Sequence, residues 1–162
     1  CAAAFIAGDK SRFSLSGGIE LIDSLSTIYQ DSLGVMGWEI VDSGFKVIFS
    51  RDIPAIVKEY VNPNIKEMLE LNKLELSDIS HYVTHPDGLK VINTYEESLG
   101  LKTGKLDISR KVLREHGNMS SPSVIYVLNE FQKSGKFSLN EYGLLSALGP
   151  GFSSELILFK TA

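Results

Sequence analysis

The stretch ISHYVTHPDG, residues 79–88, together with the segment 89–99 that follows it, decides the fold class. Residues 79–84 have the apolar and β-branched character of a short buried strand, and Pro86 blocks its continuation because proline cannot donate to a strand ladder. The segment 89–99 is periodic in the way of a helix. A buried strand followed directly by a helix indicates an α/β fold.

Working outward, the flanking segments predict further strands and helices. Residues 38–41 and 45–49 flank Asp-Ser-Gly and form a hairpin signature. Asp52 can cap a helix that begins at Pro54, and Pro63 should kink that helix. Further elements are a buried strand at 2–7, an undecided segment at 19–33, helices from Asp107 or Ser109 and from Ser121-Pro122, and strands at 142–148 and 155–160. We therefore expect a layered mixed sheet, of a five-stranded type, covered by helices.

The bulk properties predict one soluble domain over residues 1–162, since no linker or internal repeat divides the chain. A net charge of -4 without a lysine and arginine cluster argues against nucleic-acid binding. No apolar run reaches the roughly 18 residues of a membrane span. The single cysteine allows no internal disulfide, which fits a reducing cytoplasm. The start, CAAAFIAG, has no signal-peptide pattern and is interpreted as a strand entered in the middle of a longer chain.

The first candidate for chemistry is His85, which follows a strand at the point where Pro86 ends it. Ligands of open α/β sheets bind in the crevice at the carboxyl ends of the strands, so this position suits a site. The alternative is a structural histidine in a turn, satisfied by a backbone carbonyl. His81, within the strand, and His116, at a helix end, are weaker candidates.

The second candidate is Asn118, which lies between a helix end at Gly117 and the helix start at Ser121-Pro122. Its amide could face a developing oxyanion, or it could simply belong to a helix-terminating Gly-Asn pair. The turn Gly149-Pro150-Gly151 is stiff and lacks side chains, so it could form a cavity wall or an ordinary hairpin turn. Cys1 is expected to be a small buried hydrophobe rather than a nucleophile.

Taken in order, these segments resemble the C-terminal half of type III polyketide synthases, the chalcone and stilbene synthase family. Ala2-Ala3-Ala4 looks like the strand after the family's Gly-Asp-Gly segment, and residues 52–57, DIPAIV, are similar to its Asp-Val-Pro-Gly-Ile-Val helix start. Residues 85–88, HPDG, match its His-Pro-Gly-Gly element, and residues 117–121, GNMSS, match its Gly-Asn-Met-Ser-Ser element. Gly149-Pro150-Gly151 matches its cavity loop. The order and spacing of these motifs carry the resemblance.

The resemblance implies one half of a two-half thiolase-like fold, with the nucleophilic cysteine in the missing N-terminal half. His85 and Asn118 would complete a Cys-His-Asn triad, favour the thiolate, and stabilise the enolate formed when malonyl-CoA loses carbon dioxide. The enolate would attack an enzyme-bound acyl group taken from an acyl-CoA starter. No metal or redox cofactor is implied. The full-length protein is expected to be a cytoplasmic homodimer, and the present chain alone to be inactive.

The resemblance also assigns substrate-binding positions, namely Val47, Gly88, Ser120, Gly149, Pro150, Gly151 and Phe152. Val47 replaces a cavity phenylalanine of plant members, which favours a bacterial enzyme of the alkylpyrone type. Asp87 replaces a glycine, and we interpret it as a cap for the helix after Gly88. Two alternatives stay open: a ketoacyl-carrier-protein synthase of the third type, and a non-catalytic acyl-binding domain with the same fold.

Overall fold

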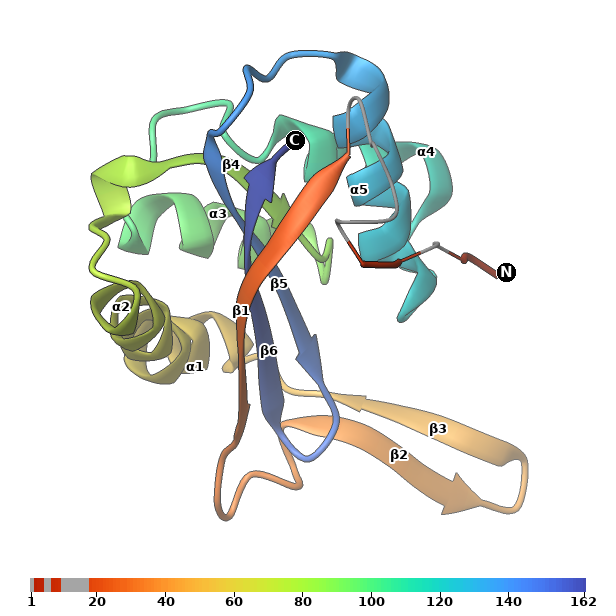
Figure 1. Ribbon diagram of the computed structural model, residues 1–162. Coiled ribbons are helices and arrows are strands. Elements are labelled where there is room, and N and C mark those ends of the chain that lie inside the picture. Colours follow the sequence, from red (N-terminus) through yellow and green to blue (C-terminus); the bar gives the residue numbers. More distant parts are fainter. Residues whose placement is uncertain (1, 5–6, 10–17) are drawn as a thin grey trace.

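The computed structural model describes residues 2–4, 7–9 and 18–162, and its centre is a mixed β-sheet (Figure 1). Four strands of the described chain form this sheet in the order β1-β6-β5-β4. Their bounds are β1 (Ile19–Ile28), β4 (Ile79–Thr84), β5 (Tyr142–Gly149) and β6 (Ser153–Thr161). β4 runs parallel to β5, whereas β6 is antiparallel to both of its neighbours. The mixed sheet is confirmed, with four strands in the described part of the chain rather than five.

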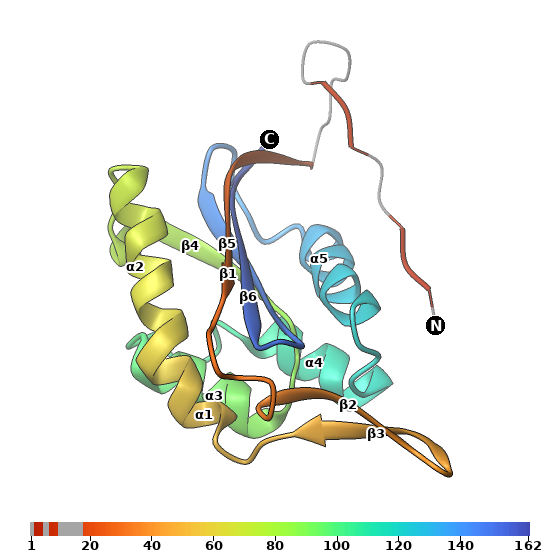
Figure 2. The same ribbon diagram turned by 90° about the horizontal axis from the view of Figure 1, so that it is seen from below.

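Helices cover both faces of the sheet, as Figure 2 shows with the sheet seen edge-on. One layer contains α1 (Ile53–Ile56), a π-helical turn (Val57–Val61), α2 (Asn62–Leu71) and α3 (Leu89–Ser98). The other contains α4 (Asp107–His116) and α5 (Pro122–Ser134). A short 3-10 helix (Leu76–Asp78) leads into β4. None of the described helices is long and apolar enough to cross a membrane.

Strand side chains alternate between the two helical layers, as the two-residue period of a strand requires. Tyr82 and Leu144 belong to the core cluster beneath α1, α2 and α3. Val83 and Leu145, their neighbours along the same strands, belong to the cluster beneath α4 and α5. Burial on both faces explains why residues 79–84 form an apolar run rather than an alternating one.

A separate two-stranded hairpin, β2 (Met36–Val41) and β3 (Gly44–Phe49), extends away from the sheet (Figure 1). Its register pairs Val41 with Gly44 around Asp42-Ser43, so the sequence-based prediction of this hairpin is confirmed. At its base, the Gly151 amide donates to the Met36 carbonyl at 3.3 Å.

Three local predictions were wrong. Of the strand predicted at 2–7, residues 2–4 and 7 are exposed and outside the described strands, and residues 5–6 lie outside the described residues. Pro63 occupies the first turn of α2, where a missing N–H is tolerated, and the irregularity is instead the π-helical turn before it. Asp52 precedes α1 without capping it through its side chain, and its carboxylate accepts a hydrogen bond from the Ser50 hydroxyl at 3.3 Å. The undecided segment 19–33 contains the strand β1.

Candidate active site

The candidate site lies where β4 ends. The His85 amide donates to the Ser146 carbonyl at 2.8 Å, which continues the parallel ladder between β4 and β5 by one residue. Pro86 then ends the ladder. The carboxyl ends of parallel strands share one edge of a sheet, so His85 and the turn after β5 lie at the same edge.

The His85 side chain is buried between two acceptors. Only 7% of it is exposed, and its Nε2 atom lies 2.9 Å from the backbone carbonyl oxygen of Ser120. Its Nδ1 atom lies 3.0 Å from Oδ1 of Asp87, whose side chain is 3% exposed. That contact has the distance of an ion pair, although its alignment is not that of a regular hydrogen bond. Both ring nitrogens therefore face oxygen atoms.

Asn118 is joined to the same turn. Its Nδ2 donates to the backbone carbonyl of Asp87 at 3.3 Å, and its Oδ1 accepts the amide hydrogen of Ser120 at 2.8 Å. Ser120 has a positive φ of 62°, an uncommon conformation for a non-glycine residue. The loops 85–88 and 117–121 are thus bonded to each other, and the structure brings His85, Asn118 and Ser120 together.

The loop after α4 is also anchored to α5. The buried Ser123 hydroxyl accepts the Met119 amide hydrogen at 2.8 Å, beside the N-terminus of that helix. Gly88 occupies the N-cap position of α3, so this helix begins without a side-chain cap. The interpretation of Asp87 as a helix cap is wrong, because its carboxylate faces His85 instead.

Burial and their mutual contact shift the pKa values of His85 and Asp87. Burial by itself lowers the pKa of His85, but the Asp87 carboxylate and the Ser120 carbonyl outweigh burial and raise that pKa. Burial also raises the pKa of Asp87, against the opposing effect of His85. The two groups titrate as a unit, and both shifts favour the protonated pair.

Hydroxyl groups support this turn from the neighbouring elements. The Ser109 hydroxyl of α4 donates to the Thr84 carbonyl at 2.7 Å, and the Ser146 hydroxyl of β5 donates to the Thr84 hydroxyl at 3.1 Å. Tyr95 of α3 is buried, and its burial, together with the charge of Asp87, raises the pKa of its phenol. No sequence pattern singled out Tyr95 or the pairing of Asp87 with His85.

The turn between β5 and β6 is held against the segment that follows β1. The Ser32 hydroxyl donates to the Gly151 carbonyl at 3.0 Å, and the Phe152 amide donates back to that hydroxyl at 2.6 Å. Pro150 is exposed at the tip. The Phe152 side chain is fully buried and stacks on Tyr29 with ring centroids 5.6 Å apart. Phe152 therefore fixes the turn from inside the core rather than presenting its ring at the surface.

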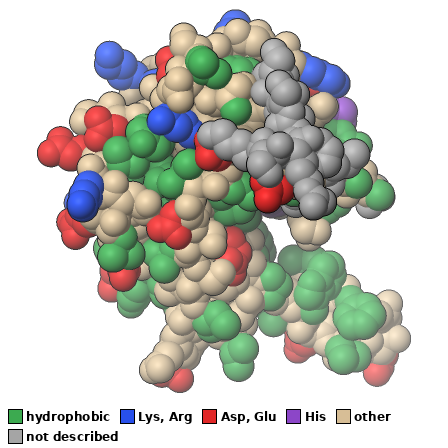
Figure 3. Space-filling view, viewed as in Figure 1, with side chains coloured by type: hydrophobic (Ala, Val, Ile, Leu, Met, Phe, Trp, Pro, Cys, Tyr) green, Lys and Arg blue, Asp and Glu red, His purple; other side chains and the backbone are tan. Residues whose placement is uncertain are grey.

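The hairpin presents one apolar face. Trp38 pairs with Val47 and Ile40 pairs with Phe45, so all four side chains lie on the same side. Their exposed fractions are 58%, 55%, 82% and 74% in that order. Figure 3 shows hydrophobic side chains gathered on this hairpin at the lower right. Val47, a predicted substrate-binding residue, thus belongs to a larger exposed apolar surface.

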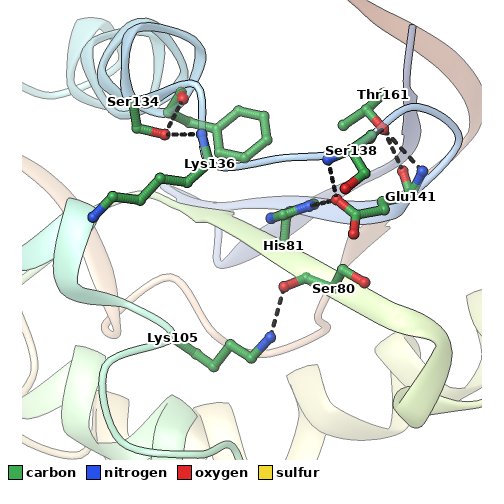
Figure 4. Close-up of polar contacts among 9 residues, drawn as sticks. Ser80, His81, Lys105, Ser134, Lys136, Ser138, Glu141 and Thr161 are labelled. Atoms are coloured by element: carbon green, nitrogen blue, oxygen red, sulfur yellow. Dashed lines mark hydrogen bonds and ion pairs between the residues drawn. The ribbon is translucent and has the colours of Figure 1, made fainter.

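The other histidines contact groups other than His85 and Asn118. His81 pairs with Glu141 through an Nε2–Oε2 contact of 2.7 Å, in the polar cluster of Figure 4. His116 contacts the ring of Tyr126. Cys1 lies outside the described residues. Among the described residues, no group of histidine, cysteine and acidic side chains could hold a metal ion.

A mixed sheet between two helical layers, with His85 at the carboxyl end of a parallel strand, defines one half of a thiolase-like fold. The chain belongs to the family of chalcone and stilbene synthases, C-terminal domain, which it matches over residues 20–162.

Relatives and solved structures agree with this membership. The chain is 44% identical to a Bacillus subtilis (strain 168) protein named "Putative chalcone synthase", covering 98% of this chain and 44% of that protein. It is 34% identical to 1,3,6,8-tetrahydroxynaphthalene synthase of Streptomyces peucetius subsp. caesius, covering 82% of this chain and 35% of that protein. The chain thus spans less than half the length of these relatives.

Two solved structures share the fold. The crystal structure of PKS-I from the brown alga Ectocarpus siliculosus superposes with a TM-score of 0.83 at 23% identity, covering 95% of this chain and 42% of that one. The C-terminal type III polyketide synthase domain of Steely1 from Dictyostelium superposes with a TM-score of 0.80 at 24% identity, covering 88% and 40%.

Proposed function

We propose that the full-length protein is an acyltransferase that condenses an acyl-CoA starter with malonyl-CoA by decarboxylative Claisen condensation, yielding polyketides of the pyrone or chalcone type. The observation that carries this proposal is that hydrogen bonds join the loop of His85, residues 85–88, to the loop of Asn118, residues 117–121. An imidazole and an amide held together at a strand end are suited to stabilise a developing enolate oxygen. The CoA thioesters are substrates, and no metal or redox cofactor takes part in this scheme.

In the proposed mechanism, an upstream half of the protein supplies a nucleophilic cysteine. A protonated His85 beside that thiol lowers its pKa and favours the thiolate, which accepts the acyl group from the starter. On substrate binding, Nε2 of His85 and Nδ2 of Asn118 would exchange their bonds to the Ser120 and Asp87 carbonyls for bonds to the thioester carbonyl of malonyl-CoA, which they stabilise as carbon dioxide leaves. The resulting enolate attacks the bound acyl thioester and extends it by two carbons. Gly88 and Ser120, beside the pair, line the substrate position in this scheme.

The apolar face of the hairpin supports an upstream partner for this chain. Exposed apolar surface of this kind marks an interaction surface or a ligand groove. We assign it to contacts with the N-terminal half and to the acyl cavity, with Val47 and the turn Gly149-Pro150-Gly151 as cavity walls. The backbone bond from Gly151 to Met36 fits this assignment, since it ties the turn to the base of the hairpin. We further propose a cytoplasmic homodimer.

The test uses the full-length protein with labelled malonyl-CoA and short, aromatic and long-chain acyl-CoA starters, and mass spectrometry identifies the products. His85→Ala and Asn118→Ala should each lower the condensation rate by about 10²–10³, the usual effect of losing one such donor. His81→Gln is the matched control and should retain activity, because this histidine pairs with Glu141 away from the loops 85–88 and 117–121.

The outcomes separate the candidate functions. Pyrone or resorcinol products that disappear in both site variants support the proposal and identify the starter class. Condensation only with carrier-protein substrates would favour a ketoacyl-carrier-protein synthase, and no condensation with any substrate would favour a non-catalytic acyl-binding domain. The 162-residue chain alone should not decarboxylate malonyl-CoA, because it lacks the upstream cysteine of the scheme.

A further inference from the structure

We propose that Asp87 is a positioning residue for His85, whose buried carboxylate fixes the imidazole ring and keeps it in the doubly protonated, cationic form. This inference rests on the proposed function, in which a cationic His85 favours the cysteine thiolate. It gives a role to a side chain that stands where the family motif quoted above has a glycine.

The first argument is the inventory of hydrogen-bonding atoms around the ring. The Ser120 carbonyl, 2.9 Å from Nε2, can only accept a hydrogen bond, so Nε2 must carry a proton to satisfy it. An ionised Asp87 carboxylate, 3.0 Å from Nδ1, is likewise an acceptor. Nε2 thus donates to the Ser120 carbonyl, and Nδ1 lies within ion-pair distance of the carboxylate without the alignment of a regular hydrogen bond, so the charge of Asp87 favours a proton on Nδ1 as well. Removing the carboxylate would leave Nδ1 without the group that favours its proton.

The second argument is the position of Asp87 between the two candidate residues. Its side chain faces His85, while its backbone carbonyl accepts the Asn118 amide at 3.3 Å. With 3% of the side chain exposed, the carboxylate is too buried to be retained as a charge without a partner. α3 makes no use of it as a cap. Oδ1 has His85 as its partner, whereas the buried Oδ2 has no hydrogen-bond partner among the described residues.

The groups that α3, α4 and β5 direct toward the pair are uncharged in the described part of the chain. Tyr95 faces Asp87 from α3, and its raised pKa keeps it a neutral phenol. α4 and β5 contribute the hydroxyls of Ser109 and Ser146, both bonded to Thr84. The raised pKa of His85 agrees with the geometry, whereas burial raises the pKa of Asp87 and opposes its ionised form.

The test compares Asp87→Asn and Asp87→Gly with the full-length wild-type protein. Asp107→Asn is the control, because that carboxylate lies on α4 with a side chain 72% exposed. The deciding readout is the ¹⁵N NMR titration of the His85 ring, with its signals assigned from a His85→Gln variant. We expect the pKa of His85 to fall in both Asp87 variants and to stay unchanged in Asp107→Asn. Two variants guard against a single one failing to fold, which circular dichroism would reveal.

A second readout links the pair to the thiol. Iodoacetamide should alkylate the upstream cysteine about tenfold more slowly in Asp87→Asn near neutral pH, since losing one charged neighbour shifts such equilibria by at least this factor. An unchanged His85 titration in folded Asp87 variants would overturn the inference. A lowered titration in a protein that makes no polyketide would instead support the inference and count against the proposed function.

Discussion

Gly143 offers a test of the packing between β5 and β6. A Cβ atom at this position would lie 2.1, 2.4 and 2.7 Å from three ring carbons of Phe159, whereas carbon atoms pack at about 3.5–4.0 Å. The Phe159 ring is fully buried and meets Phe131 with centroids 5.8 Å apart, so it has little room to move. Gly143→Ala should therefore lower the free energy of unfolding by about 1–3 kcal/mol, near the upper end, as overpacking in a dense core does.

Urea unfolding followed by far-ultraviolet circular dichroism measures this loss. Gly37→Ala in β2 is the matched control, since its Cβ would meet only the Leu33 carbonyl at an ordinary 3.8 Å. In a Phe159→Leu background the penalty of Gly143→Ala should fall to less than half, because the clashing ring atoms are gone. A Gly143→Ala protein within about 0.5 kcal/mol of wild type, or an equal penalty in both backgrounds, would refute the packing argument.

Two ion pairs give further predictions. Arg110 joins α4 to α3, because its Nη1 and Nη2 atoms each donate to a carboxylate oxygen of Glu96 at 2.7 Å. Arg110→Lys should therefore lower the free energy of unfolding by about 1 kcal/mol, measured by thermal unfolding. Arg114→Lys is the control and should leave it almost unchanged, since the Arg114 side chain is 72% exposed. The hydrogen bond with His81 holds the pKa of Glu141 under its usual range in the folded state (Figure 4). The ionised Glu141 therefore stabilises the folded state at pH values above the pKa that Glu141 has in the unfolded chain. This contribution is lost as the pH falls through the lower pKa of Glu141 in the folded state. Glu141→Gln should flatten the decline in stability between about pH 5 and pH 3, and an unchanged decline would contradict this.

Most elements were predictable because their signals are local. The strand at 79–84 and the hairpin around Asp42-Ser43 depend on apolar patterns and turn residues a few positions apart. The segment 19–33 was undecided because its pattern suits both periods, and it becomes a strand only by pairing with β6, far away in the chain. The small residues at 2–4 have strand-like composition, but composition does not supply a partner strand.

The candidate site was predictable in its positions but not in its contacts. His85 and Asn118 stood out because one follows a strand and the other separates two helices. The role of Asp87 was missed, since the local rule for an acidic residue before a helix is capping. Its pairing with His85 depends on a turn that buries both side chains, which no spacing rule encodes. Likewise, the interior position of Phe152 follows from its contact with Tyr29 of the distant β1–β2 region.

The place of β6 in the sheet has a consequence for how the chain acquires its structure during synthesis. β6 lies between β1 and β5, and it pairs with β1 from Thr161–Ile19 to Ser153–Ile28. Among the described strands β1 pairs with β6 alone. Because the ribosome makes β6 after every other described element, this pairing cannot form until nearly all of the described chain has emerged. Such distant pairing slows folding and leaves strand edges open in the meantime. A nascent chain stalled before residue 153 would thus be a substrate for chaperones rather than a folded domain.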